Sequence, residues 1–172
     1  RACPDAKIVK TLNTVTAAVE ISMFMDGQVH VLVAGHQARA VADAACAIAG
    51  VAKVIHADGA QFAHGSAENM AAQVLSIAGH YSHIMFASTA SGKNVAPRVA
   101  AKLDVGQISD VTRIESADTF SRPIYAGNAI ATVQSLDAIK VITVRTTGFD
   151  AAAVRDGAAI VESVAAVAAI GG

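Results

Sequence analysis

Apolar positions in the first part of the chain alternate between a helical and a strand-like period. Residues 8–19 repeat apolar side chains every three or four positions, which predicts one face of an amphipathic helix that ends near residues 23–27. The valine-rich run at 29–34 is apolar at nearly every position, as in a strand that is buried on both faces. The same succession then repeats, so we expect strands at 29–34, 51–57 and 83–87 between successive helices. The apolar faces of these helices are Ile8, Leu12, Val15 and Val19; Val41, Ala44, Ala45 and Ile48; Met70, Val74 and Ile77; and Val95, Val99 and Leu103.

Capping and stop signals agree with these helices. Ser66 is suited to cap the third helix, with Glu68 placed favourably for the helix dipole. Gly50 and Gly79 are helix stops, and Pro97 is expected in the first turn of the fourth helix. Strands that alternate with helices pair in parallel through right-handed crossovers, so helices should cover both faces of the sheet.

The pattern changes after residue 104. Four strand-like segments follow with no helix between them, at 111–115, 120–126, 129–134 and 140–145, and Gly127-Asn128 is typical of a hairpin turn. We therefore expect an antiparallel extension of the sheet. The alanine- and valine-rich segment 151–170 predicts a closing helix with Val154, Ala158, Val161 and Ala165 on one face. The expected fold is a single α/β domain over residues 1–172, three-layer α/β/α, with a mostly parallel, Rossmann-like sheet and an antiparallel extension after residue 104.

Composition and charge exclude several classes of protein. The chain has 172 residues, of which 53% are apolar and 16% charged, so intrinsic disorder is excluded. Aromatic residues make up 4%, the formal net charge is -1, and there is no basic run, so neither nucleic acid nor an anionic membrane is an expected partner. The longest apolar stretches are far too short to cross a bilayer, so no direct membrane insertion is expected.

The segment 88–94 is the first candidate for chemistry. It follows a predicted strand and opens a helix, where backbone N–H groups and the helix dipole can hold a phosphate. Its Ser91, Gly92 and Lys93 resemble the end of a P-loop, but Ala87 stands in place of the first glycine and Asn94 in place of the magnesium-binding Ser or Thr. A polar turn with Lys93 in solvent is the favoured interpretation, and a vestigial anion site is the alternative.

No other grouping indicates catalysis or metal binding. The histidines and cysteines share no helix face at metal-ligand spacing, and neither a G-x-S-x-G elbow nor a pair of facing carboxylates is evident. We therefore expect no catalytic and no metal-ligating residue.

The segment 122–128 (RPIYAGN) combines Arg122, Tyr125 and Asn128 around the predicted hairpin turn. One interpretation is structural: Tyr125 and Asn128 pin the hairpin, and Arg122 pairs with an acid such as Asp110. The other is a subunit contact, because arginine and tyrosine are common interface anchors. The sequence favours neither over the other.

Several segments, in this order and spacing, together resemble the amino-terminal domain of the electron transfer flavoprotein α subunit. The resemblance implies an adenine-nucleotide-hydrolase-like fold and an αβ heterodimer in the bacterial cytoplasm or the mitochondrial matrix. It also implies that the whole protein carries electrons from acyl-CoA and related dehydrogenases to a membrane quinone oxidoreductase and is not an enzyme. FAD would bind in a carboxy-terminal domain, and this domain would pack against the β subunit. The segments are 11–18 (TLNTVTAA), 29–35 (VHVLVAG), 50–54 (GVAKV), 92–103 (GKNVAPRVAAKL), 108–111 (ISDV), 122–128 (RPIYAGN) and 141–150 (VITVRTTGFD).

Two departures from the family pattern shape the expectations. The family usually opens with an apolar strand, whereas residues 1–6 are mostly polar and include Pro4, so a sheet position should be left unsatisfied. The chain ends at Gly171-Gly172, where the family continues into the FAD domain, so we expect no FAD ligand within it. An assembly domain of an electron carrier is the first hypothesis. A small adenine-nucleotide-binding module that uses segment 88–94 is the alternative, and it leaves the run from Arg122 to Asp150 unexplained.

Overall fold

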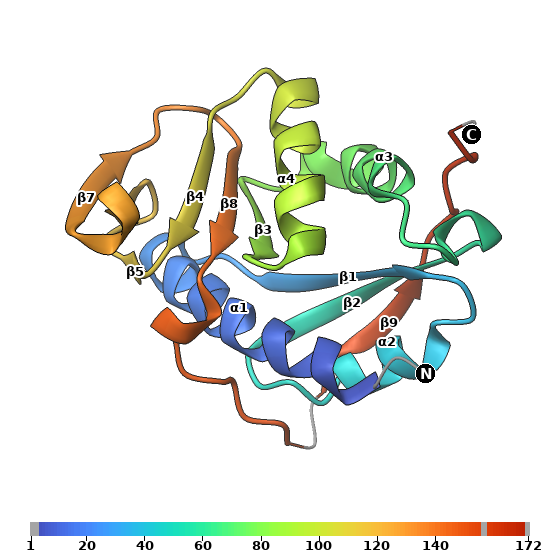
Figure 1. Ribbon diagram of the computed structural model, residues 1–172. Coiled ribbons are helices and arrows are strands. Elements are labelled where there is room, and N and C mark those ends of the chain that lie inside the picture. The colour runs from blue at the N-terminus through green and yellow to red at the C-terminus, as the bar shows by residue number, and fades with distance from the viewer. Residues whose placement is uncertain (1–3, 156–157, 171–172) are drawn as a thin grey trace.

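The succession of helices and strands predicted up to residue 103 is confirmed in a computed structural model, which describes residues 4–155 and 158–170, with side chains from residue 11 onward. The helix that opens the chain is long, and each later helix leads into or out of a parallel strand (Figure 1). The elements are α1 (Pro4–Met25), β1 (Val29–Gly35), α2 (Arg39–Ala45), β2 (Val51–Asp58), α3 (Ala67–Ile77), β3 (His83–Ala87) and α4 (Ala90–Leu103).

The strands form three groups. Two groups are parallel, ordered β1-β2-β9 and β3-β8-β4, and the third is antiparallel, ordered β5-β6-β7. Among the described strands, β1 and β3 each pair on one side only, and their other edges are open. The remaining strands are β4 (Gln107–Val111), β5 (Arg113–Ile114), β6 (Thr119–Ile124), β7 (Ala129–Gln134), β8 (Lys140–Val144) and β9 (Ile160–Ser163).

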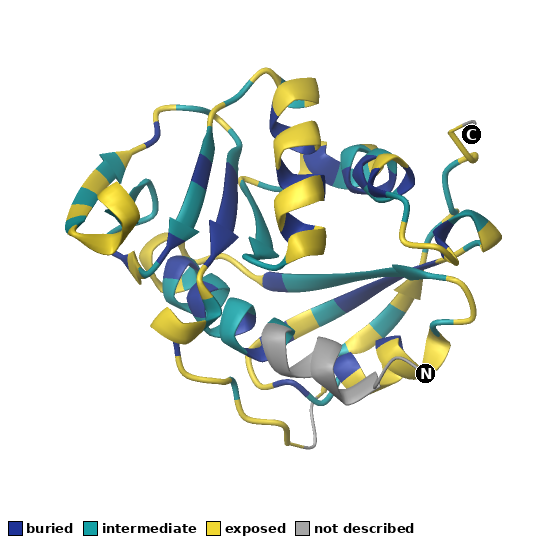
Figure 2. Cartoon of the chain, viewed as in Figure 1, coloured by how far each residue is buried: buried dark blue, intermediate teal, exposed yellow. Residues whose placement is uncertain are grey.

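Alternating side chains of the parallel strands divide the core into layers, which confirms the three-layer α/β/α fold. On β3, Ile84 and Phe86 pack with α3 and α4, whereas Met85 packs on the opposite side with Ala17 and Ile21 of α1. Figure 2 shows the same division on α4, which buries the side that faces the strands and exposes the other. Such period-two alternation is what a sheet covered by helices on both faces requires.

Two details of the helices differ from the expectation. Val41 is 41% exposed, and the buried face of the second helical segment is Ala42, Ala45 and Ile48. Pro97 lies inside α4 and not in its first turn, because the helix begins at Ala90. The early start follows from Thr89, whose side chain accepts a hydrogen bond from the Gly92 N–H (3.2 Å) and caps the helix.

The antiparallel extension is confirmed for β5, β6 and β7 but is wrong for the strands on either side of them. The strand expected at 111–115 is the short β5 at 113–114. An additional strand, β4 at 107–111, precedes it, and both β4 and β8 run parallel. After the hairpin the chain returns between β3 and β4, where His83 lies opposite Lys140 and Gln107 opposite Val141. This position buries β8 on both faces, and it suits the apolar sequence of β8 better than a position at the edge of the sheet would.

The predicted closing helix at 151–170 is wrong. Ile160–Ser163 is a strand that pairs parallel with β2, and residues 164–170 continue without helix along α3. Side-chain amides hold that backbone: Gln73 Oε1 accepts from Val167 N–H (2.9 Å) and Asn69 Oδ1 accepts from Ile170 N–H (2.8 Å). The free edge of β2 and these buried amides outweigh the helix propensity of alanine.

Candidate functional site

The amino end of α4 holds the residues that resemble a P-loop, but it also holds a carboxylate. Lys93 Nζ lies 3.5 Å from Asp110 Oδ1, and the Ser88 hydroxyl donates a hydrogen bond to the same oxygen. That hydroxyl is the main cause that lowers the pKa of Asp110, with Lys93 contributing. Asp110 itself is fixed by its backbone N–H, which donates to Thr143 Oγ1 (2.9 Å). The local anion is therefore a side chain of the protein.

Gly92 is explained by packing. A Cβ atom at this position would lie 2.0 Å from the carbonyl oxygen of Ala87 and 3.3 Å from Phe86 Cβ, so α4 approaches β3 closely here. Ser91 and Lys93 are exposed on the outer side of the same turn. The structure brings the three predicted residues together, but Lys93 faces Asp110. Ser88 belongs to the predicted segment 88–94, but no sequence signal indicated its contact with Asp110 or the ion pair between Asp110 and Lys93.

The β6–β7 hairpin holds the second set of predicted residues. Arg122 Nε donates to the Ser109 carbonyl (2.7 Å), so the expected pairing with Asp110 is wrong. Asn128 N–H donates to the Tyr125 carbonyl (3.1 Å) and closes the turn, and Gly127 has a φ of +93°. The Tyr125 side chain is 78% exposed, so it does not pin the hairpin.

Exposed apolar side chains extend this surface in a way that the sequence did not reveal. Ile130 is 63% exposed on β7 and Leu136, just beyond the strand, is 88% exposed. Ala129 pairs with Ile124, so Ile130 lies at the same end of the hairpin as Tyr125. The outward positions of β7 are Ile130, Thr132 and Gln134, so Ile130 is the apolar residue that this strand exposes, at the end next to Tyr125. Two large apolar side chains exposed at one end of the hairpin are candidates for a docking surface.

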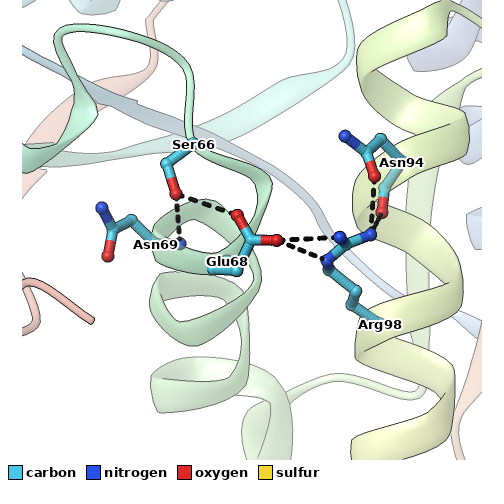
Figure 3. Close-up of polar contacts among 5 residues, drawn as sticks. All are labelled: Ser66, Glu68, Asn69, Asn94 and Arg98. Atoms are coloured by element: carbon cyan, nitrogen blue, oxygen red, sulfur yellow. Dashed lines mark hydrogen bonds and ion pairs between the residues drawn. The ribbon is translucent and has the colours of Figure 1, made fainter. Parts of the chain in front are cut away.

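A polar cluster between α3 and α4 has a structural role (Figure 3). Ser66 Oγ accepts from Asn69 N–H (3.3 Å) and donates to Glu68 (3.1 Å), which confirms the predicted cap. Arg98 Nη2 donates to Glu68 Oε1 (2.8 Å) and Nη1 to the Asn94 side chain (2.6 Å). Glu68 and Arg98 are 30 positions apart, so no sequence spacing indicated this link. Because it is exposed, it orients the two helices more than it stabilises them.

The described residues offer neither a metal site nor a membrane span. Residues 4–155 and 158–170 include no group of three or more His, Cys, Asp or Glu side chains arranged to hold a metal ion. Within the same ranges, no helix is both long enough and apolar enough to span a membrane.

Comparison with known proteins places these features in a family. A family model described as the electron transfer flavoprotein domain matches residues 7–169. The chain belongs to the electron transfer flavoprotein family. The electron transfer flavoprotein subunit alpha of Pseudomonas aeruginosa is 56% identical over 154 residues, which are 90% of this chain and 48% of that protein. The corresponding subunit of Paracoccus denitrificans is 54% identical over 140 residues, which are 81% of this chain and 46% of that protein.

Likeness to the electron transfer flavoproteins extends beyond bacteria. The mitochondrial subunit alpha of Dictyostelium discoideum is 44% identical over 160 residues, which are 89% of this chain and 44% of that protein. The chain spans about half the length of the curated relatives that it matches. The resemblance inferred from the motifs in 11–150 is thereby confirmed.

Proposed function

We propose that this chain is the assembly domain of an electron transfer flavoprotein α subunit and that it docks onto the β subunit through the turn end of the β6–β7 hairpin. The observation that carries this proposal is the exposure of Tyr125 (78%) in the turn and of Ile130 (63%) at the adjoining end of β7. Tyrosine is among the residues that most often dominate the binding energy of protein interfaces, and an exposed apolar side chain near it marks a surface suited to burial. Arg122 links β6 of the hairpin to β4, because its Nε donates a hydrogen bond to the Ser109 carbonyl.

The whole protein would carry electrons from acyl-CoA and related dehydrogenases to a membrane quinone oxidoreductase, in the bacterial cytoplasm or the mitochondrial matrix. It would be a carrier and not an enzyme. The support is the name shared by the relatives, one of which is mitochondrial.

FAD would be bound by a part of the protein outside residues 4–170. At the amino end of α4, the place for a pyrophosphate is next to the Asp110 carboxylate, and the Gly92 N–H is already bonded to Thr89. These residues do not fit a flavin nucleotide, because a second anion there would be repelled. The same contacts leave the alternative, an adenine-nucleotide-binding module that uses segment 88–94, with no observation in its favour.

The test is complex formation between this chain and a β subunit of the family. Size-exclusion chromatography and titration calorimetry would compare the native chain with the double variant Tyr125→Ala, Ile130→Ser. The expected result is a complex for the native chain and an affinity at least tenfold lower for the variant, because two interface anchors are truncated.

A matched control separates the loss of the two hairpin side chains from the general effect of removing an exposed apolar side chain. Val154 is 59% exposed and lies outside the hairpin, so Val154→Ser removes a comparable apolar side chain elsewhere. This control should bind as the native chain does. Equal binding by the hairpin variant and the native chain would refute the hairpin as the docking site. A stoichiometric flavin retained by the purified 172-residue chain would refute the placement of FAD.

A further inference from the structure

A cavity of about 380 Å³ lies near the amino ends of β1 and β2, and none of its lining residues belongs to the hairpin or to α4. His30 of β1 lies opposite Lys53 of β2, and Ile55 of β2 lies opposite Glu162 of β9, the strand alongside β2 in Figure 1. Paired residues, and alternate residues along a strand, point to the same face, so these four side chains share one face of the sheet. The end of α3 and the turn after it, at 77–81, lie on that side and contribute to the lining.

Lys53 and Glu162 bring opposite charges side by side in this lining. Lys53 Nζ lies 2.6 Å from Glu162 Oε2, and the two side chains keep 33% and 50% of their surface exposed, so a ligand can reach both from solvent. An ammonium group has three N–H donors and a carboxylate can accept about four hydrogen bonds, whereas their mutual contact uses one of each. The pair therefore presents hydrogen-bond donors and acceptors next to each other.

Tyr81 and His30 add polar groups to the lining without adding charge. The Tyr81 hydroxyl and His30 Nδ1 are 2.9 Å apart and share a hydrogen bond, and the two rings meet edge to face. Burial is the largest cause that lowers the pKa of His30 and raises the pKa of Tyr81, so both side chains are neutral at pH 7. His30 Nε2 is buried, and the described residues supply no hydrogen-bond partner for it.

Apolar side chains complete the cavity. Ile55 belongs to β2, Ile77 to the end of α3, and Val164 to the segment that follows β9. Small-molecule sites typically combine such apolar walls with a few polar groups that orient the ligand. The ligand that matches this cavity therefore carries two adjacent opposite charges and a short apolar group.

We propose that the cavity binds a small zwitterion, namely a free α-amino acid with an aliphatic side chain. Its carboxylate accepts hydrogen bonds from Lys53 and its ammonium group donates to Glu162, so the four charges alternate in sign around a closed ring. Its side chain packs on Ile55, Ile77 and Val164. This site is separate from the docking surface on the hairpin and does not depend on the proposed assembly function.

Ligands of other chemistry match the cavity less well. A carboxylate without an ammonium group gains contact with Lys53 but is repelled by Glu162, and an amine without a carboxylate meets the converse repulsion. An uncharged apolar molecule would displace water from both charged groups and return no hydrogen bond to either. An α-amino acid avoids both costs because its two charges are adjacent.

The test is the binding of L-leucine to the 172-residue chain, measured by titration calorimetry and by the shift in melting temperature. Binding should be saturable and one-to-one, and leucine should raise the melting temperature as mass action requires. 4-Methylpentanoate lacks the ammonium group and 3-methylbutylamine lacks the carboxylate, so each should bind at least about tenfold more weakly. Glycine should also bind at least about tenfold more weakly, because it buries no side chain.

Variants of the chain assign the two charges. Lys53→Met and Glu162→Gln should each weaken leucine binding at least about tenfold, since each removes one charged partner. Arg39→Met is the matched control, because Arg39 forms an exposed ion pair with Asp43 (2.8 Å) outside the cavity, and it should bind leucine as the native chain does.

The single-charge analogues separate a lost contact from a lost structure. In Lys53→Met the amine no longer meets a like charge, so it should bind more tightly than it binds the native chain, and 4-methylpentanoate should do the same in Glu162→Gln. A variant that had lost the cavity would bind neither. Circular dichroism would establish that the variants fold, and the ligand series on the native chain decides the proposal without them.

Three results would overturn the inference. The first is the absence of saturable leucine binding. The second is a single-charge analogue that binds the native chain as tightly as leucine, which would assign the cavity to anions or to cations. The third is leucine affinity that is unchanged in folded Lys53→Met or Glu162→Gln, which would place the amino acid elsewhere on the protein.

Discussion

Replacement of Gly92 by alanine tests whether this glycine serves packing or ligand binding. Gly92 is the third residue of α4, so the substitution alone would stabilise the protein by less than the roughly 1 kcal/mol of a helix interior, because alanine is the better helix former. Here the added methyl group would meet the Ala87 carbonyl oxygen at 2.0 Å. That oxygen belongs to the backbone of β3 and cannot rotate away, so α4 must move outward.

The magnitude follows from the distance. A methyl carbon and a carbonyl oxygen require about 3.4 Å, so α4 or β3 must yield by more than 1 Å, and the buried contacts of Val95 and Val99 with the sheet loosen. Overpacking of this kind typically costs about 1–3 kcal/mol, and collision with backbone places Gly92 at the upper end. After the gain in helix propensity, we expect a net loss of about 2 kcal/mol, or a melting temperature lower by about 4–8 °C.

Urea and thermal unfolding, followed by circular dichroism, would measure this loss against Gly79→Ala. Gly79 has no atom within 4 Å of its added Cβ and no positive φ, so the control should lie close to the native stability. A Gly92→Ala variant as stable as the native chain would refute the packing argument. It would then revive a ligand-binding role for the segment, which AMP or ATP added to both proteins would reveal as a shift in melting temperature.

Two further predictions concern residues 164–170 and the turn between β5 and β6. Gln73→Leu leaves the Val167 N–H and the Ala165 carbonyl without their side-chain partner. Limited proteolysis should therefore cut residues 164–170 faster in this variant than in the native chain, while β2 stays protected, and equal cleavage of both proteins would contradict this role of Gln73. Hydrogen bonds from Gln134, Thr119 and Ser116 lower the pKa of Asp118 from 3.8 to about 2. The contribution of the Asp118 carboxylate to stability is therefore present above pH 4 and is lost as the pH falls towards 2. Over that interval the urea midpoint of Asp118→Asn should decline less than the midpoint of the native chain. Equal declines of the two midpoints would contradict this contribution of Asp118.

Periodicity and capping were sufficient to predict the first part of the fold. The faces of α1, α3 and α4 follow from apolar spacing, and the Ser66 cap follows from residue type, because both depend on neighbours within one or two turns. The position of β8 between β3 and β4 depends on pairing across more than 50 residues, which no local pattern encodes. Segment 151–170 was misassigned for the same reason, since its outcome depends on the open edge of β2.

The residues of the candidate surfaces also divide into those that the sequence indicates and those that only the fold reveals. Arg122, Tyr125 and Asn128 were found because unusual residue types surround a turn signal in an otherwise plain sequence. Ile130 does not stand out in the sequence, because it is one of several apolar residues in a predicted strand. Only the fold shows that no other element covers its side chain. Exposure of an apolar side chain is a property of the tertiary arrangement, so interface residues of this kind are visible only in a structure.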